Sequence, residues 1–224
     1  MKPVSLLLLI VWGASPVVAD SPPETALCQP VELLTSESFA RPDAFDLKGK
    51  PGATGWRPGI GEWKIVDGAA YAIQEGPSEK RPNGHEAVCE YVTNQGDLVL
   101  TAEFKLGDSP QVGFVCRDTN SPNLHLGRVL ITPTAIWVQK MSGIAKETRK
   151  EELTRMPVQL DPQTWHRVTV EVCGDRWLAR IDDHTIEGSH ARFQDRKGRV
   201  GFVARGEGAQ FRNVAVWSAT AKPQ

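Results

Sequence analysis

The stretch DLVLTAEFKL, residues 97–106, decides the fold class of this chain. Alternation of apolar and polar residues predicts a β-strand with one buried face and one wetter face. The buried parity holds Leu98, Leu100, Ala102, Phe104 and Leu106, and the other parity holds Val99, Thr101, Glu103 and Lys105.

The same alternation recurs along the chain about every 8 to 12 residues, as expected of a sandwich or barrel. In WHRVTVEVC, residues 165–173, Val168, Val170 and Val172 share the inward parity, whereas Glu171 lies on the outward one. Further predicted strands cover 63–66, 69–74, 87–92, 111–117, 123–131, 134–141, 176–181, 184–188, 199–204 and 210–217.

These strands predict an all-β domain of two packed antiparallel sheets, and about a dozen strands favour a concanavalin-like jelly roll over an immunoglobulin sandwich. The charged segment IAKETRKEELTRM, residues 144–156, is interpreted as a solvated loop or a short rim helix. The sequence therefore predicts one sandwich domain with little helix.

The expected domain organisation follows from the two ends of the chain. A charged start, a short apolar run and a small-residue cleavage site near Ala19 predict a signal peptide at 1–19, and hence export to the periplasm or the cell exterior. Residues 20–36 are interpreted as a linker or N-terminal arm, 37–218 as the sandwich, and 219–224 as a tail.

Composition limits the partners. The 224 residues carry 26 basic and 27 acidic side chains, a balance that gives no reason to expect nucleic acid as a partner. No stretch after the signal is long and apolar enough to predict a membrane span. No C-x-x-C pair or phosphate loop occurs, so we expect no metal and no cofactor.

The chain has four cysteines, which are Cys28, Cys89, Cys116 and Cys173. Cysteines of an exported protein can be oxidised, and we expect one disulfide or none among these four.

Four segments, in order, resemble the 3-keto-disaccharide hydrolase-type domain, a concanavalin-like sandwich related in fold to laminarinase-type glycosidases. They are GEWKIVDGAAYA (61–72), QVGFVCRD (111–118), WHRVTVEVCGDRWLARIDD (165–183) and RVGFVARGEGAQFRNVAVW (199–217). The resemblance covers roughly residues 37–217 and implies an exported protein that acts on glycosides.

The chain also departs from this family. Where the family often shows Asn-Ser-Gly before the arginine of the central strand, this chain has 111–113 as Gln-Val-Gly and retains Arg117. A glutamate that the family often carries on the next strand is missing, and His125 and Arg128 occur there instead. The laminarinase string E-x-D-x-x-E is also absent, which argues against that mechanism.

Glu103, Lys105 and Arg117 form the first candidate site. If the wetter face of 97–106 is the concave one, they could hold sugar hydroxyls, with Glu103 as general base. The alternative is a solvated face with cross-strand ion pairs.

His125 and Arg128 form a second candidate, for catalysis and substrate binding respectively. Their parity differs, so they face one groove only if a β-bulge intervenes. Arg128 also shares its parity with leucines, which is unusual for a plain core strand.

Trp137 and Gln139 are candidates for substrate binding. A half-exposed indole is a platform for a sugar ring, and the alternative is an indole that caps the edge of the sandwich.

Two functions are consistent with these residues. The first is a glycoside hydrolase of the resembled type, and the second is a non-catalytic carbohydrate-binding or structural module of the same fold. Both predict a carbohydrate or surface partner. Release of product from 3-keto-glucosides and β-glucans distinguishes them.

Overall fold

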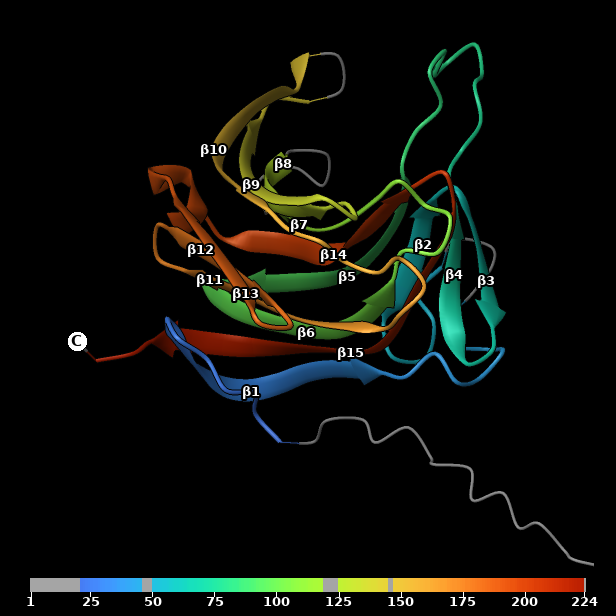
Figure 1. The fold of residues 1–224 in the computed structure, drawn as a ribbon. Helices are drawn as coiled ribbons and strands as arrows, with labels where there is room; N and C mark the ends of the chain where they lie inside the picture. Colours follow the sequence, from blue (N-terminus) through green and yellow to red (C-terminus); the bar gives the residue numbers. More distant parts are fainter. Residues whose placement is uncertain (1–20, 46–49, 119–124, 145–146, 224) are drawn as a thin grey trace, which may run out of the picture.

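The computed structural model describes residues 21–45, 50–118, 125–144 and 147–223, so the expected signal peptide lies outside the described residues. The described chain forms an eight-stranded and a seven-stranded antiparallel sheet that pack face to face (Figure 1). The predicted concanavalin-like sandwich of two antiparallel sheets is therefore confirmed.

The two sheets take strands from all parts of the chain. The eight-stranded sheet has the order β13 (His184–Ser189), β12 (Arg176–Ile181), β11 (His166–Cys173), β6 (Asp97–Lys105), β15 (Glu207–Ala221), β4 (Ala69–Ile73) and β3 (Glu62–Val66), and β1 (Cys28–Glu37) also pairs with β15. The seven-stranded sheet has the order β10 (Arg149–Pro157), β9 (Ala135–Ser142), β8 (His125–Ile131), β7 (Gln111–Asp118), β14 (Lys197–Arg205), β5 (Ala87–Gln95) and β2 (Trp56–Ile60).

The core fills the space between the sheets. Phe202 of β14 and Phe211 of β15 stack with ring centroids 4.3 Å apart, and Phe104 meets Phe114 edge to face at 6.1 Å. The inward parity predicted for β6 and β11 is confirmed, because these apolar side chains are buried in the same cluster. Aromatic pairs of this geometry hold the two layers in one register.

The seven-stranded sheet is curved. Figure 1 shows β10, β9 and β8 rising on one side of it and the loop between β4 and β5 rising on the other. The face that the sheet turns away from the core is called the concave face below.

Two strands, β1 and β2, were not predicted, and a third, β10, was assigned to a loop or short helix. Cys28–Glu37, assigned above to a linker or arm, forms β1 and pairs with β15 from Cys28↔Ala221 to Glu37↔Val214. The sandwich therefore begins at Cys28 and extends to Ala221, beyond the predicted limits of 37–218. Trp56–Ile60 forms β2 at one edge of the seven-stranded sheet.

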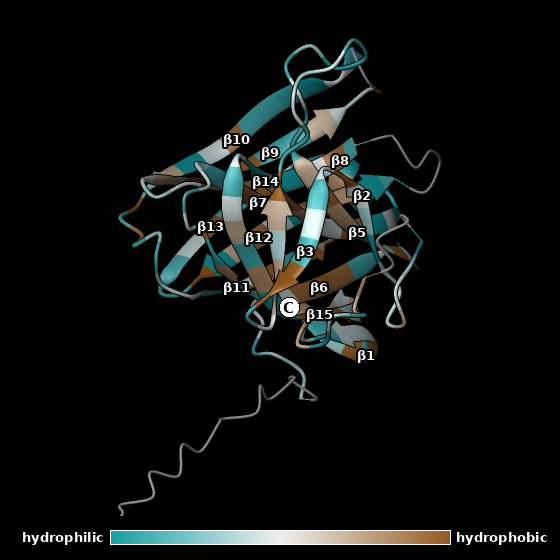
Figure 2. Cartoon of the chain, turned by 90° about the vertical axis from the view of Figure 1, so that its right-hand side faces the viewer, coloured by the Kyte–Doolittle hydropathy of each residue, from teal (hydrophilic) through white to brown (hydrophobic). Residues whose placement is uncertain are grey.

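The expectation of a loop or short helix at 144–156 is wrong for residues 149–157. They form β10, an edge strand that is hydrophilic along most of its length (Figure 2). Its charges pair locally: Lys140 Nζ of β9 lies 2.9 Å from Glu151 Oε2, and Arg155 pairs with Glu152. Charged edge strands protect a sheet against pairing with other chains, so charge here does not exclude a strand.

The positions of the cysteines limit the disulfides. Cys89 of β5 and Cys116 of β7 have β14 between them, so their strands are ~9.6 Å apart. This exceeds the Cα separation that a disulfide tolerates. Cys28 and Cys173 lie together in a separate buried cluster.

We therefore expect Cys89 and Cys116 to stay reduced even when the protein is purified under oxidising conditions. Burial raises the pKa of both thiols, which also makes them slow to react. Peptide mapping without reductant measures this, and a Cys89–Cys116 bridge would contradict the strand order.

In the part of the chain that the structure describes, no helix is long and apolar enough to cross a bilayer.

Candidate functional site

An apolar row crosses the concave face from one edge of the sheet toward the other. Its members pair across neighbouring strands, and all of them except Gly113 belong, together with Val115, to a separate hydrophobic cluster outside the core. The row consists of Ile60 of β2, Val88 of β5, Val203 of β14, Gly113 of β7, Leu130 of β8 and Trp137 of β9.

A buried ion-pair group lies beside this row. Glu90 of β5 accepts hydrogen bonds from Nε of Arg117 and, at 3.2 Å, from Nη1 of Arg199. Glu90 and Arg117 are both buried, and Arg199 is about one-fifth exposed. One carboxylate therefore serves two guanidinium groups.

A second group has the same composition. Glu86 accepts from Nη1 of Arg128 at 3.0 Å and from Nε of Arg205 at 2.9 Å, while Nε of Arg128 donates to Gln139 Oε1 at 3.0 Å. Burial acts to raise the pKa of Glu86, but Arg128 and Arg205 outweigh it and lower that pKa below its usual value. Glu86 is thus ionised at neutral pH.

His125 joins this face because β8 contains an irregularity. Cys116 pairs with Gly127 but Arg117 pairs with His125, so the register skips Leu126. Leu126 and Val129 both point into the core, and His125 and Arg128 consequently share the concave side. The β-bulge that these two side chains need in order to face one groove is therefore present.

The imidazole of His125 is neutral at working pH. Burial, followed by the charges of Arg117 and Arg128, lowers its pKa to about 3. An imidazole with that pKa is a weak general base and has no acidic proton to transfer to a substrate near neutrality. It can still hydrogen-bond a ligand hydroxyl through either ring nitrogen.

Trp137 lies on the concave face but does not offer an open platform. Its side chain is 8% exposed, and the guanidinium carbon of Arg155 lies 4.2 Å from the ring centroid. The expectation of a half-exposed indole is therefore wrong, because the cation of the neighbouring strand covers the ring. The indole Nε1 of Trp137 has no hydrogen-bond partner among the described residues.

Glu103 and Lys105 lie on the other side of the molecule. Their strand, β6, belongs to the eight-stranded sheet, and Glu103 Oε2 accepts from Arg212 Nε at 2.7 Å. The guanidinium carbon of Arg212 lies 4.0 Å above the ring of Trp165, and Lys105 Nζ lies 5.3 Å from it. The solvated face with cross-strand ion pairs is thus what the structure shows here.

The predicted site residues therefore divide into two groups. Arg117, His125, Arg128, Trp137 and Gln139 share the concave face. Glu103 and Lys105 belong to the opposite sheet, so they do not converge with the others in one cleft. Whether any of these residues contacts a substrate stays a prediction.

Several charged residues of the concave face were not identified from the sequence, among them Glu90, Lys150, Arg199 and Arg205. The sequence carries a signal for the two arginines. In RVGFVAR, residues 199–205, both arginines share a parity opposite to the core residues Val200 and Phe202.

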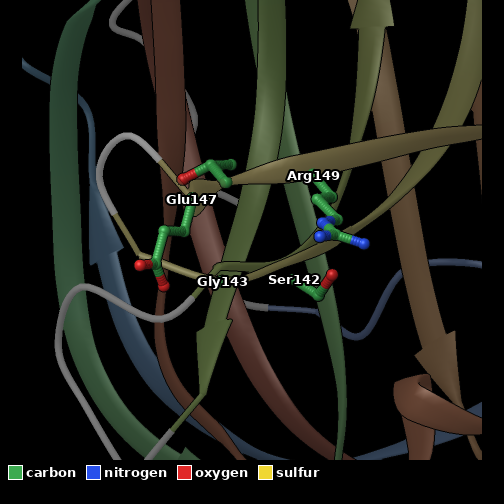
Figure 3. A pocket seen from close by; sticks show the side chains of 5 residues that line it. Ser142, Gly143, Glu147 and Arg149 are labelled. Atoms are coloured by element: carbon green, nitrogen blue, oxygen red, sulfur yellow. The ribbon is translucent and has the colours of Figure 1, made fainter.

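A shallow hollow at the tip of the β9–β10 hairpin lies apart from this charged face. Ser142, Gly143, Glu147 and Arg149 line it, with Thr148 (Figure 3). It holds one arginine and one glutamate and shares no lining residue with the charged groups of the concave face, so we do not include it in the site.

The arrangement suits binding better than proton transfer. A glycosidase needs one protonated and one ionised carboxyl group on either side of the scissile bond. On the described concave face, Glu86 and Glu90 each accept from two arginines, and the arginines beside Glu86 hold the pKa of its carboxyl below the usual value. The guanidinium groups and the neutral imidazole remain as hydrogen-bond partners for a ligand.

The sequence matches no protein-family model and no curated protein. Among solved structures, the chain is similar to a β-agarase A in complex with oligoagarose, with a TM-score of 0.60, 8% identity, and coverage of 85% of this chain and 93% of that one. It is also similar to the κ-carrageenase from Pseudoalteromonas carrageenovora in complex with a κ-carrageenan oligosaccharide, with a TM-score of 0.57, 11% identity, and coverage of 92% of this chain and 100% of that one. A third match is the carbohydrate-binding module CBM66 from Bacillus subtilis, with a TM-score of 0.50, 11% identity, and coverage of 75% of this chain and 96% of that one. At these identities the likeness concerns the fold alone, which is the concanavalin-like jelly roll.

Proposed function

We propose that this chain is an exported carbohydrate-binding protein that holds a saccharide on its concave face without hydrolysing it. The observation that carries the proposal is the pair of glutamate–arginine groups on that face, next to the apolar row. Charged side chains in partly buried positions are costly for a fold to retain and are more often found where a ligand is bound.

The fold supports a saccharide as the ligand. The agarase and the carrageenase are named as complexes with oligosaccharides, and CBM66 is named as a carbohydrate-binding module. Sugars present hydroxyls together with apolar C–H faces. Arg205 and Gln139 offer hydrogen-bond partners for the hydroxyls, whereas Val88, Val203 and Leu130 of the apolar row are themselves buried.

Hydrolysis of 3-keto-disaccharides, which the sequence resemblance implies, has less support on this face. The family glutamate has no counterpart on β8, where His125 and Arg128 stand. The pKa of Glu86 is lowered rather than raised, so it is a poor general acid at neutral pH. We therefore prefer the binding role.

Residues 20–224 purified without the expected signal test this proposal. We expect a saccharide array to detect binding, and 3-keto-glucosides and β-glucans to remain uncleaved. Arg128→Gln should weaken binding about tenfold, because a hydrogen bond from a charged donor is worth at least that factor.

Arg212→Gln on the opposite sheet removes the same charge and should leave binding unchanged. Thermal melts of both variants separate a binding loss from unfolding. Steady release of product from any of these glycosides would contradict the proposal, as would equal losses in the two variants.

A further inference from the structure

The charges of the concave face are unbalanced. Two carboxylates, Glu86 and Glu90, face four guanidinium groups, and each carboxylate is already shared by two of them. Lys150 of β10 adds a further cation, with no ion-pair partner among the described residues, whereas Arg155 above Trp137 is paired with Glu152. The whole chain, in contrast, has a net charge of −1.

The neighbouring basic groups respond to this excess. Burial lowers the pKa of Lys150, and the charges of Arg128 and Arg205 lower it further against the opposing charge of Glu86. The pKa of His125 is also lowered, first by burial and then by the charges of Arg117 and Arg128. These groups therefore lie in a region of positive potential that their own carboxylates do not cancel.

Several donors on this face remain available. Arg205 uses only Nε toward Glu86, and its side chain is 51% exposed. Arg199 uses only Nη1 toward Glu90, among the hydrogen bonds of the described residues. A guanidinium fork offers two parallel N–H groups to the two oxygens of a carboxylate or a sulfate, whereas a single sugar hydroxyl has only one oxygen to meet them.

We propose that the concave face selects acidic saccharides, with Arg205 and Lys150 binding carboxylate or sulfate substituents beside the Glu86–Arg128 pair and Arg199 binding them beside Glu90. This inference rests on the proposed function, since it names the class of saccharide that the same face takes. A neutral glycan leaves the excess charge uncompensated, but an acidic one neutralises it in a partly desolvated setting where such contacts are stronger than in water.

The test is calorimetric titration of residues 20–224 with three oligosaccharides of equal length: a neutral β-1,3-glucan, an oligogalacturonate and a sulfated galactan. We expect at least one acidic ligand to bind about tenfold more tightly than the neutral one. Added salt should reduce this advantage, because exposed charges such as that of Arg205 are screened. The tighter of the two acidic arms assigns the recognised group as carboxylate or sulfate.

Two variants on the face and two matched controls locate the site. Arg205→Gln and Lys150→Gln should each weaken acidic binding severalfold and weaken binding of the neutral glucan by a smaller factor. Arg205→Gln leaves Glu86 paired with Arg128, so its fold should persist. Arg167→Gln and Lys64→Gln remove the same charges from exposed positions on the eight-stranded sheet and should change nothing.

The remaining outcomes separate the two proposals. Equal affinity for the neutral and acidic ligands overturns the inference but leaves saccharide binding intact. Equal losses in the control variants also overturn it, since binding would then follow net charge alone. Failure of all three oligosaccharides to bind overturns the proposed function together with the inference.

Discussion

Glu171→Ala should destabilise the protein by about 3 kcal/mol and free its N-terminal segment. The carboxylate of Glu171 is fully buried and accepts hydrogen bonds from the backbone N–H groups of Ala26, Leu27 and Cys28 at 2.7, 2.7 and 2.9 Å. Each hydrogen bond to a charged acceptor is worth roughly 1.5–3 kcal/mol. The total loss is smaller than their sum because the segment can detach and hydrogen-bond to water.

Chemical denaturation measures the change in free energy, and hydrogen exchange measures its location. Protection from exchange should fall selectively at the amides of residues 26–28, and the protection of the β6 amides should stay unchanged. Arg167→Ala is the matched control, because Arg167 lies on the same face of β11 and its side chain is 85% exposed. We expect that control to lie within about 0.5 kcal/mol of the parent. An unchanged midpoint for Glu171→Ala would show that the segment is held by other contacts.

Glu171 also shows what the sequence pattern could predict. Alternation in 165–173 correctly placed Val168, Val170 and Val172 in the core and Glu171 on the outer face. It could not show that the outer face is covered there by residues 26–28, which come from a segment with no periodicity of its own. Local pattern determines the side of a strand but not what covers it.

The candidate site illustrates a second limit. Parity separates the wet side of a strand from the dry side, but it does not assign the strand to one of the two sheets. Glu103 and Arg117 both lie on outward faces, yet β6 and β7 belong to opposite layers. Those faces are therefore separated by the core. Sheet assignment depends on pairing between segments far apart in sequence, such as β14 with β5 and β7.

The edge strand β10 illustrates a third limit. A charged segment resembles a loop when burial is the only criterion, and β10 has few buried positions. Its backbone pairs with β9 on one side only, so few of its side chains need to be apolar. Such strands follow from the geometry of the completed sheet rather than from their own pattern.

Glu90→Gln should be more damaging than Glu171→Ala, with an expected loss of about 3–5 kcal/mol. The substitution keeps the shape of the side chain but removes the charge that two guanidinium groups share. Arg117 is buried with Glu90 and has little access to water, so its charge would be left uncompensated. For a domain of this size the midpoint of thermal unfolding should fall on the order of 10 °C.

A double-mutant cycle tests whether the uncompensated charge is the cause. Arg117→Met in the Glu90→Gln background removes the buried cation, and we expect it to restore at least ~1 kcal/mol, because apolar replacement of a buried ion pair is often neutral. Arg212→Met, which removes an arginine from the opposite sheet, should restore nothing in that background. If the losses of Glu90→Gln and Arg117→Met simply add, the two side chains are not coupled. The ion-pair group would then contribute to stability through packing alone, and the case for a charged binding face would lose its energetic basis.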